Sequence, residues 1–164
     1  MSSVAVIDYG MGNLHSIAKA LQHASPNVDV QILADADLIL QADRVVFPGV
    51  GAMRDCMRAL NDSGLSGVIQ SVAKTKPLLC ICLGMQALLT DSEENNNTQG
   101  LGILPGKVVH FPEALLDSHG NKLKIPHMGW NQVHFHLTHY GKISHRIVVF
   151  ILYIVIMQNL TIPL

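Results

Sequence analysis

Short apolar runs alternate along this chain with segments of helical periodicity. The run Val4-Ala5-Val6-Ile7-Asp8 is continuous and ends in a glycine turn, as a strand buried on both faces does. Similar patterns predict further strands at 28–33, 44–47 and 78–82. Between these strands, the spacing of apolar residues predicts helices over 13–24, part of 34–42, 52–60 and 65–73. Alternating strands and helices predict an α/β fold, with a mostly parallel sheet covered on both faces.

The pattern becomes less regular after residue 90. Residues 91–100 are polar and rich in asparagine, which predicts a loop. Later strands are predicted at 107–111 and 132–137, joined by an irregular connection over 112–124. No internal repeat is apparent, so a single fold unit is expected.

The strand at 78–82 contains the clearest candidate chemistry. It runs into Cys82, then a glycine at Gly84, and then a helix-forming stretch, which is the order of a nucleophile elbow. The amino end of the following helix favours a thiolate, and its backbone N–H groups can hold an oxyanion. We therefore predict Cys82 as a nucleophile, and we interpret Cys80 and Cys56 as small buried hydrophobic residues.

Three candidate segments fall at the carboxyl ends of predicted strands. Asp8, Pro48-Gly49 and Cys82 can therefore share one rim of the sheet, where ligands bind in folds of this class. The loop Gly49-Val50-Gly51 is rich in glycine, which allows backbone N–H groups to approach a reacting carbonyl closely. Taken alone, however, Pro-Gly is more often an ordinary turn.

Composition narrows the class of protein further. A chain of 164 residues with a net charge of −1 suits one domain and gives no reason to expect a nucleic-acid surface. The nine histidines are scattered, and His134 and His136 fit a solvated strand face better than a metal site, so no metal or cofactor is expected. The three cysteines suit a reducing cytoplasm, and the sequence opens on a strand instead of a signal peptide.

Four motifs in order resemble those of a known family. The segment Cys82–Gln86 is similar to the nucleophile motif of class I, triad-type glutamine amidotransferases. Asp8–Leu14, Phe47–Ala52 and Pro126–Asn131 narrow the resemblance to the glutaminase subunits of imidazole glycerol phosphate synthases, which act in histidine biosynthesis. One departure is Cys80, since the elbow of the family usually has glycine two residues before the nucleophile.

The resemblance extends from about Val4 to about His139 and implies a three-layer, flavodoxin-like fold. It implies hydrolysis of L-glutamine through a Cys82 thioester, and transfer of ammonia to a cyclase partner with a (βα)8 barrel in a heterodimer. It also implies roles for the residues around Cys82. Those assigned to the oxyanion hole are Gly49, Val50 and Leu83, and those assigned to substrate binding are Gly49, Gly51, Met85 and Gln86.

The end of the chain departs from the family. A triad also needs a base and a residue that orients it, and the family carries a His and a Glu for these roles near its carboxyl end. No such motif occurs here, and no acidic residue follows Asp117. The apolar run at 147–156 is about half the length needed to span a bilayer, so no membrane segment is expected. We therefore divide the chain into a partial amidotransferase domain, 1–139, and an aberrant tail, 140–164, which leaves the fold incomplete at its C-terminus.

A shifted reading frame would explain this tail. Reading the third base of each codon with the first two bases of the next, permitted codons for Val148–Gln158 encode Arg-Phe-Tyr-Phe-Val-His-Ser-Tyr-Tyr-Ala, which resembles the family at this place. The same reading after His139 gives Leu-Trp-Lys-Asp-Ile-Ser. One lost nucleotide near codon 140 would produce the whole tail, and the alternative is a genuinely divergent C-terminus.

Three functions therefore remain open from the sequence. The first is a glutaminase that supplies ammonia to a cyclase. The second is an inactive remnant that at most binds the cyclase or glutamine. The third is a stand-alone cysteine hydrolase or chaperone of the same broad fold, against which the motifs at 48–51 and 126–131 argue.

Overall fold

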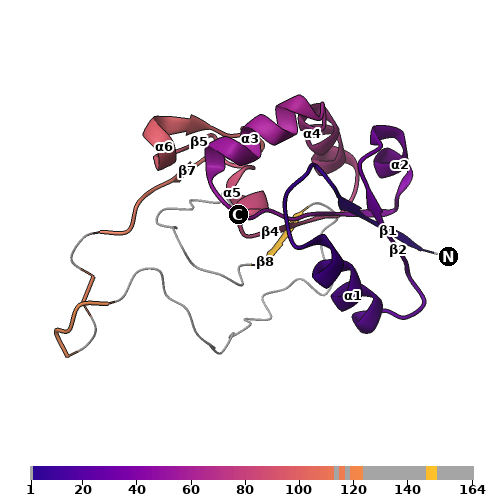
Figure 1. The fold of residues 1–164 in the computed structure, drawn as a ribbon, viewed down its shortest axis with the longest axis horizontal. Helices are drawn as coiled ribbons and strands as arrows, with labels where there is room; N and C mark the ends of the chain where they lie inside the picture. Colours follow the sequence, from indigo (N-terminus) through magenta and orange to yellow (C-terminus); the bar gives the residue numbers. More distant parts are fainter. Residues whose placement is uncertain (1, 113–114, 117–118, 124–146, 151–164) are drawn as a thin grey trace.

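Five parallel strands form the main sheet of the protein, in the order β2-β1-β3-β4-β8 (Figure 1). The computed structural model describes residues 2–112, 115–116, 119–123 and 147–150. This strand order is that of a flavodoxin-like, doubly wound sheet, so the predicted parallel α/β fold is confirmed. The strands are β1 Ser3–Ile7, β2 Asp29–Leu33, β3 Arg44–Phe47, β4 Leu78–Ile81 and β8 Ile147–Phe150.

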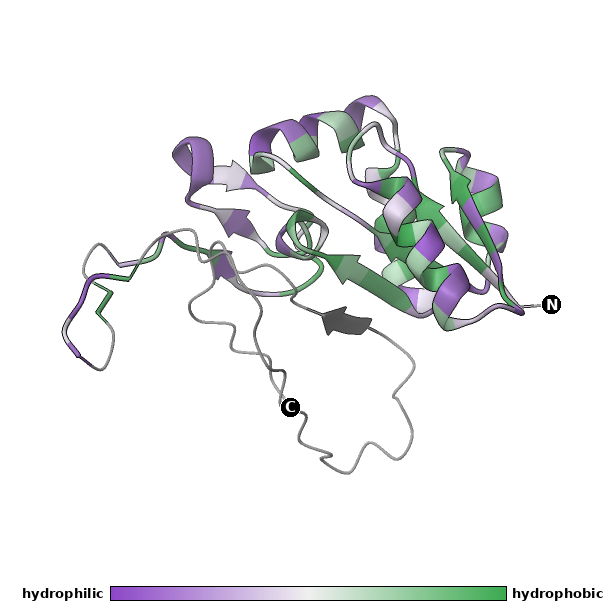
Figure 2. Ribbon diagram, turned by 60° about the horizontal axis from the view of Figure 1, so that its bottom comes forward, coloured by the Kyte–Doolittle hydropathy of each residue, from purple (hydrophilic) through white to green (hydrophobic). Residues whose placement is uncertain are grey.

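Helices cover both faces of this sheet (Figures 1 and 2). Alternation along β1 shows why, because Val4 and Val6 face α1 whereas Ala5 and Ile7 face the opposite cluster. Every strand buried on both faces must be apolar throughout, as the strands coloured in Figure 2 are. The helices are α1 Leu14–Ala24 on one face, and α2 Ala36–Gln41, α3 Met53–Asp62, α4 Ser66–Thr75 and α5 Leu83–Gln86 on the other.

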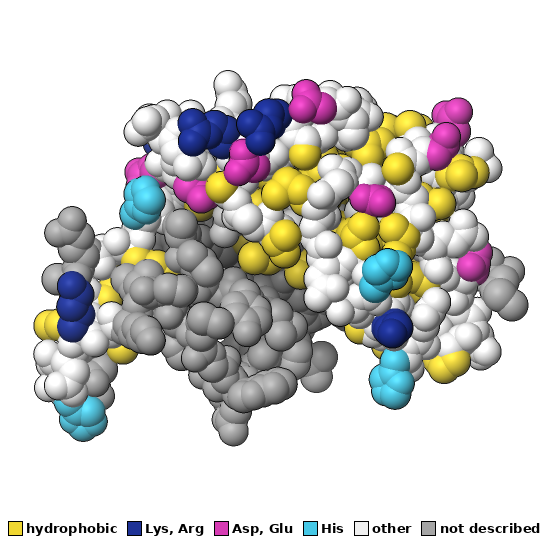
Figure 3. Space-filling view, viewed as in Figure 1, with side chains coloured by type: hydrophobic (Ala, Val, Ile, Leu, Met, Phe, Trp, Pro, Cys, Tyr) yellow, Lys and Arg dark blue, Asp and Glu magenta, His cyan; other side chains and the backbone are white. Residues whose placement is uncertain are grey.

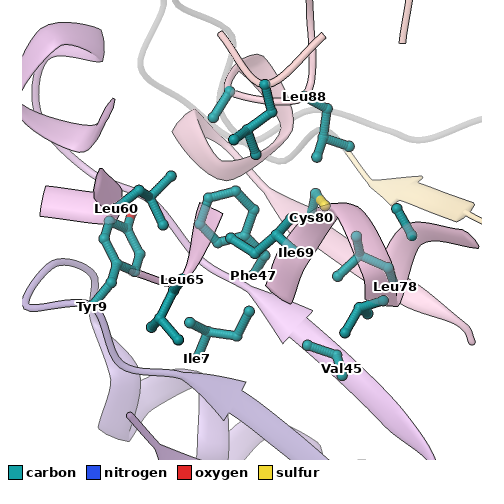
Figure 4. Packing of buried hydrophobic residues seen from close by; sticks show 14 of the residues in the cluster. Ile7, Tyr9, Val45, Phe47, Leu60, Leu65, Ile69, Leu78, Cys80 and Leu88 are labelled. Atoms are coloured by element: carbon teal, nitrogen blue, oxygen red, sulfur yellow. The ribbon is translucent and has the colours of Figure 1, made fainter. Parts of the chain in front are cut away.

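The larger core cluster lies between the sheet and helices α2 to α5. Figure 4 shows Phe47 near its centre, with Tyr9 to one side and Cys80 to the other. The rings of Tyr9 and Phe47 lie 5.4 Å apart at an interplanar angle of 60°, a favourable tilted contact. Cys56 and Cys80 are fully buried, which confirms their interpretation as small hydrophobic residues.

The prediction of a plain loop over 91–100 is wrong. This segment contributes to a small second sheet in the order β6-β5-β7. A left-handed turn at 94–97 allows the chain to reverse, because Asn95, Asn96 and Asn97 have φ of 55°, 65° and 64° and asparagine tolerates that region. The elements are β5 Asp91–Ser92, α6 Glu94–Asn97, β6 Thr98–Gln99 and β7 Lys107–Val108.

The later predictions are only partly covered by the described residues. The strand predicted over 107–111 is present but shorter, because β7 ends at Val108. The strand predicted over 132–137 lies outside the described residues. Within the tail, β8 pairs with β4 in parallel register, with Leu78 opposite Ile147 and Ile81 opposite Phe150.

Asp35 closes the amino end of α2, and its removal should cost measurable stability. Its Oδ1 accepts a hydrogen bond of 3.0 Å from the N–H of Leu38. We expect Asp35→Ala to lower the free energy of unfolding by about 1 kcal/mol in urea denaturation, as lost caps do. Asp37→Ala removes an exposed carboxylate from the same turn without removing the cap, so an equal loss there would contradict the assignment.

Candidate functional site

Cys82 occupies the turn between β4 and α5 in a conformation that few residues adopt. Its φ is 54° and its ψ is −117°, and a positive φ is costly for a side chain with a Cβ. The carbonyl of Cys82 accepts hydrogen bonds from the N–H groups of Met85 (3.0 Å) and Gln86 (3.2 Å), so the helix begins immediately after it. Cys82 is half-buried, unlike the other two cysteines. The chain thus places one accessible thiol on a sharp strand-to-helix turn.

The glycine loop after β3 lies directly against this turn. A Cβ on Gly49 would lie 2.3 Å from the backbone nitrogen of Gly84 and 2.8 Å from the carbonyl carbon of Leu83. Conversely, a Cβ on Gly84 would lie 2.3 Å from the carbonyl oxygen of Phe47. Two backbones can approach this closely only where both residues are glycine. The structure therefore brings the Gly49 loop and the Leu83 backbone together at the carboxyl ends of β3 and β4.

The loop after β1 completes the same rim. Gly12 approaches Pro48, because a Cβ on Gly12 would lie 3.2 Å from the Pro48 side chain, and a Cβ on Gly51 would lie 3.3 Å from the end of Met11. Gly51 has a φ of 90°, which favours glycine, and the neighbouring Val50 is 48% exposed. The three predicted strand ends therefore do share one rim.

Other predicted site residues lie on α5. Met85 and Gln86 are both buried, at 3% and 6% exposure. Gln86 is notable because it is a polar side chain inside an otherwise apolar layer. Asp8, at the end of β1, accepts a hydrogen bond of 3.0 Å from the N–H of Gly10 and so closes its own turn.

Tyr9 is a neighbour of the site that sequence reasoning missed. Its hydroxyl donates a hydrogen bond of 2.9 Å to the carbonyl of Pro48, and it lies 3.5 Å from Sγ of Cys56. Burial raises the pKa of Tyr9, and the negative charges that Cys56 and Cys82 would carry as thiolates raise it further, so the phenol stays protonated. The available signal was that a buried tyrosine needs a partner for its hydroxyl.

Glu94 is a second residue that the sequence did not indicate. Its Oε2 accepts a hydrogen bond of 3.1 Å from the N–H of Met53, at the amino end of α3. No side chain of Ala52 can cap this helix, so Glu94 caps it from the second sheet. The loop between β3 and α3 is therefore held at Pro48 by Tyr9 and at Met53 by Glu94.

Some predicted features cannot be placed, and others have no counterpart among the described residues. The segment 126–131 and the histidines at 134 and 136 lie outside the described residues. Within the described part of the chain, no three His, Cys, Asp or Glu side chains gather as metal ligands would, and no helix is long and apolar enough to cross a membrane. On the face seen in Figure 3, acidic and basic side chains of the described residues are interspersed.

Comparison with known proteins agrees with the geometry. A family model described as glutamine amidotransferase class-I matches residues 5–150. Imidazole glycerol phosphate synthase subunit HisH of Methylococcus capsulatus is 64% identical over 135 residues, which are 82% of this chain and 62% of the relative. The subunits of the same name from Thiobacillus denitrificans and Nitrosospira multiformis are 55% and 49% identical, over 80% and 85% of this chain. The chain spans 58% and 66% of the length of these two relatives.

Proposed function

The chain belongs to the class-I glutamine amidotransferase family, and we propose that it derives from the glutaminase subunit of an imidazole glycerol phosphate synthase. The observation that carries the proposal is the contact between the Gly49 loop and the backbone that follows Cys82. A nucleophile and a set of backbone donors are thereby adjacent, which is what acyl transfer from an amide requires.

The proposed reaction uses these groups in two steps. The Cys82 thiolate attacks the carboxamide carbon of L-glutamine, and the N–H groups of Gly49, Val50 and Leu83 stabilise the resulting oxyanion. The carbon–nitrogen bond then breaks, and protonated ammonia leaves a thioester on Cys82. Water hydrolyses the thioester, releasing glutamate and the free thiol. Substrate contacts are assigned to Gly49, Gly51, Met85 and Gln86.

The base for these proton transfers is missing from the chain as written. We assign its absence to a shifted frame over 140–164, so the polypeptide retains the nucleophile and lacks the His and Glu of the triad. The second candidate function follows from this absence: an inactive remnant that at most binds glutamine or the cyclase. A genuinely divergent C-terminus is the alternative origin of the tail.

The proposed partner is a cyclase subunit with a (βα)8 barrel. The names of the relatives describe them as subunits of a synthase, which supports a partner of this kind. Ammonia formed at Cys82 is released at the carboxyl-end rim of the sheet, so we place the interface on that rim. A cytoplasmic location, without cofactor, nucleic acid or membrane, fits this role.

Covalent labelling tests whether Cys82 reads glutamine. We expect the chloroketone analogue of glutamine, in which a chloromethyl ketone replaces the carboxamide, to alkylate Cys82 of the full chain. The Cys82 sulfur forms a bond to the methylene carbon and chloride leaves. Excess L-glutamine should slow the reaction, and Cys82→Ala should abolish it, since the other cysteines are buried. Labelling that glutamine does not slow, measured by mass spectrometry, would contradict the proposed function.

A further inference from the structure

The buried hydroxyl of Tyr9 has no part in the chemistry described so far, yet it contacts the loop that supplies the oxyanion donors. Tyr9 is 5% exposed and comes from the loop after β1. Its hydrogen bond to the Pro48 carbonyl, 2.9 Å long, joins that loop to the end of β3, 39 residues away. A buried carbonyl without this partner would be left unsatisfied, so the bond favours one orientation of the Pro48 carbonyl.

The orientation of that carbonyl determines the orientation of the next N–H. In a planar trans peptide, the C=O of Pro48 and the N–H of Gly49 point in opposite directions. Glycine alone would leave this peptide free to rotate, because Gly49 lacks a Cβ. The close contact of Gly49 with Gly84 restrains the position of the loop, but a contact between backbones does not by itself select one peptide orientation.

We propose that Tyr9 is a positioning residue, whose hydroxyl fixes the Pro48–Gly49 peptide and thereby aims the Gly49 N–H as an oxyanion donor. This inference rests on the proposed function, because it gives Tyr9 a role in that reaction alone. Tyr9 touches neither the substrate nor the reacting atoms. The neutral phenol suits the task, since a protonated hydroxyl donates to a carbonyl and a phenolate cannot.

The test compares two reagents on the full chain. The chloroketone analogue of glutamine forms an oxyanion at its ketone when the Cys82 sulfur adds, before chloride leaves. Iodoacetamide alkylates the same sulfur by direct displacement of iodide and needs no oxyanion donor. We expect Tyr9→Phe to lower the ratio of the two labelling rates by about tenfold, less than the loss of a whole donor would. A change in the thiol itself would move both rates together and leave the ratio unchanged.

Two further variants make the result specific. Cys56→Ala removes the other contact of the Tyr9 hydroxyl, at 3.5 Å, and should keep the wild-type ratio. Tyr9→Leu removes the hydroxyl with a different side-chain shape and should lower the ratio as Tyr9→Phe does. A wild-type ratio in either folded Tyr9 variant would overturn the proposal, and so would failure of both to fold, since the hydroxyl would then serve folding.

The same experiment separates this proposal from the proposed function. If the wild-type chain reacts no faster with the glutamine chloroketone than with chloroacetone, it does not read glutamine, and the proposed function fails together with this role. If the wild-type chain prefers the glutamine reagent and the Tyr9 variants keep that preference in full, only the role of Tyr9 is overturned.

Discussion

Replacing Gly84 with alanine is expected to lower the free energy of unfolding by about 3 kcal/mol or more, at the upper end for overpacked sites. The new Cβ would lie 2.3 Å from the carbonyl oxygen of Phe47 and 3.1 Å from the carbonyl carbon of Pro48. Both atoms belong to backbone, which cannot rotate aside as a long side chain can. The strand, the loop or α5 must therefore shift, and a typical domain has only about 5–15 kcal/mol of stability in total.

Gly67→Ala is the matched control for this substitution. Gly67 lies in the first turn of α4, and a Cβ there would meet no heavy atom within 4 Å. We expect this variant to be as stable as the wild type or more stable by about 0.5–1 kcal/mol, because alanine restricts the unfolded chain. Urea denaturation followed by circular dichroism measures both variants. Similar stabilities for the two would show that the close contact at Gly84 is not as described.

Restoring the reading frame should raise glutaminase activity by at least about 1,000-fold. Members of a triad act as a unit, so a nucleophile without its base retains little of the rate. Insertion of one nucleotide near codon 140 should give a longer protein that carries the missing His and Glu. Glutamate release, measured with the cyclase partner present, compares the restored protein with the chain as written.

Cys82→Ala in the restored protein is the control, and it should abolish glutamate release. Two results would contradict the proposal. One is substantial, Cys82-dependent glutamate release by the chain as written. The other is genomic DNA in which no one-base insertion near codon 140 opens a family-like frame.

The sequence was most informative where local pattern determines structure. The strand 44–47 was predicted with the observed bounds, because its apolar run is continuous and closed by Pro48-Gly49. Cys82 was predicted at a strand-to-helix turn, where the structure places it, since an apolar strand, a glycine and a helix follow one another directly.

What the sequence could not predict depends on contacts between distant residues. Tyr9 and Pro48 are 39 residues apart, and Glu94 and Met53 are 41 residues apart, so no spacing rule connects them. The second sheet was missed because its strands are two residues long, too short for any alternation to show. The three asparagines at 95–97 did indicate a turn, although not its left-handed form.

The contact between Gly49 and Gly84 also bears on the order of folding events. The segments that carry these glycines meet after β3 and β4 have paired, with Phe47 opposite Cys80. Helices α3 and α4 lie between the two strands in the chain, so this pairing must first close a long loop against its entropy. The elbow and its donor loop cannot be assembled separately and joined later. We therefore infer that the site forms late, in the same step that completes the centre of the sheet.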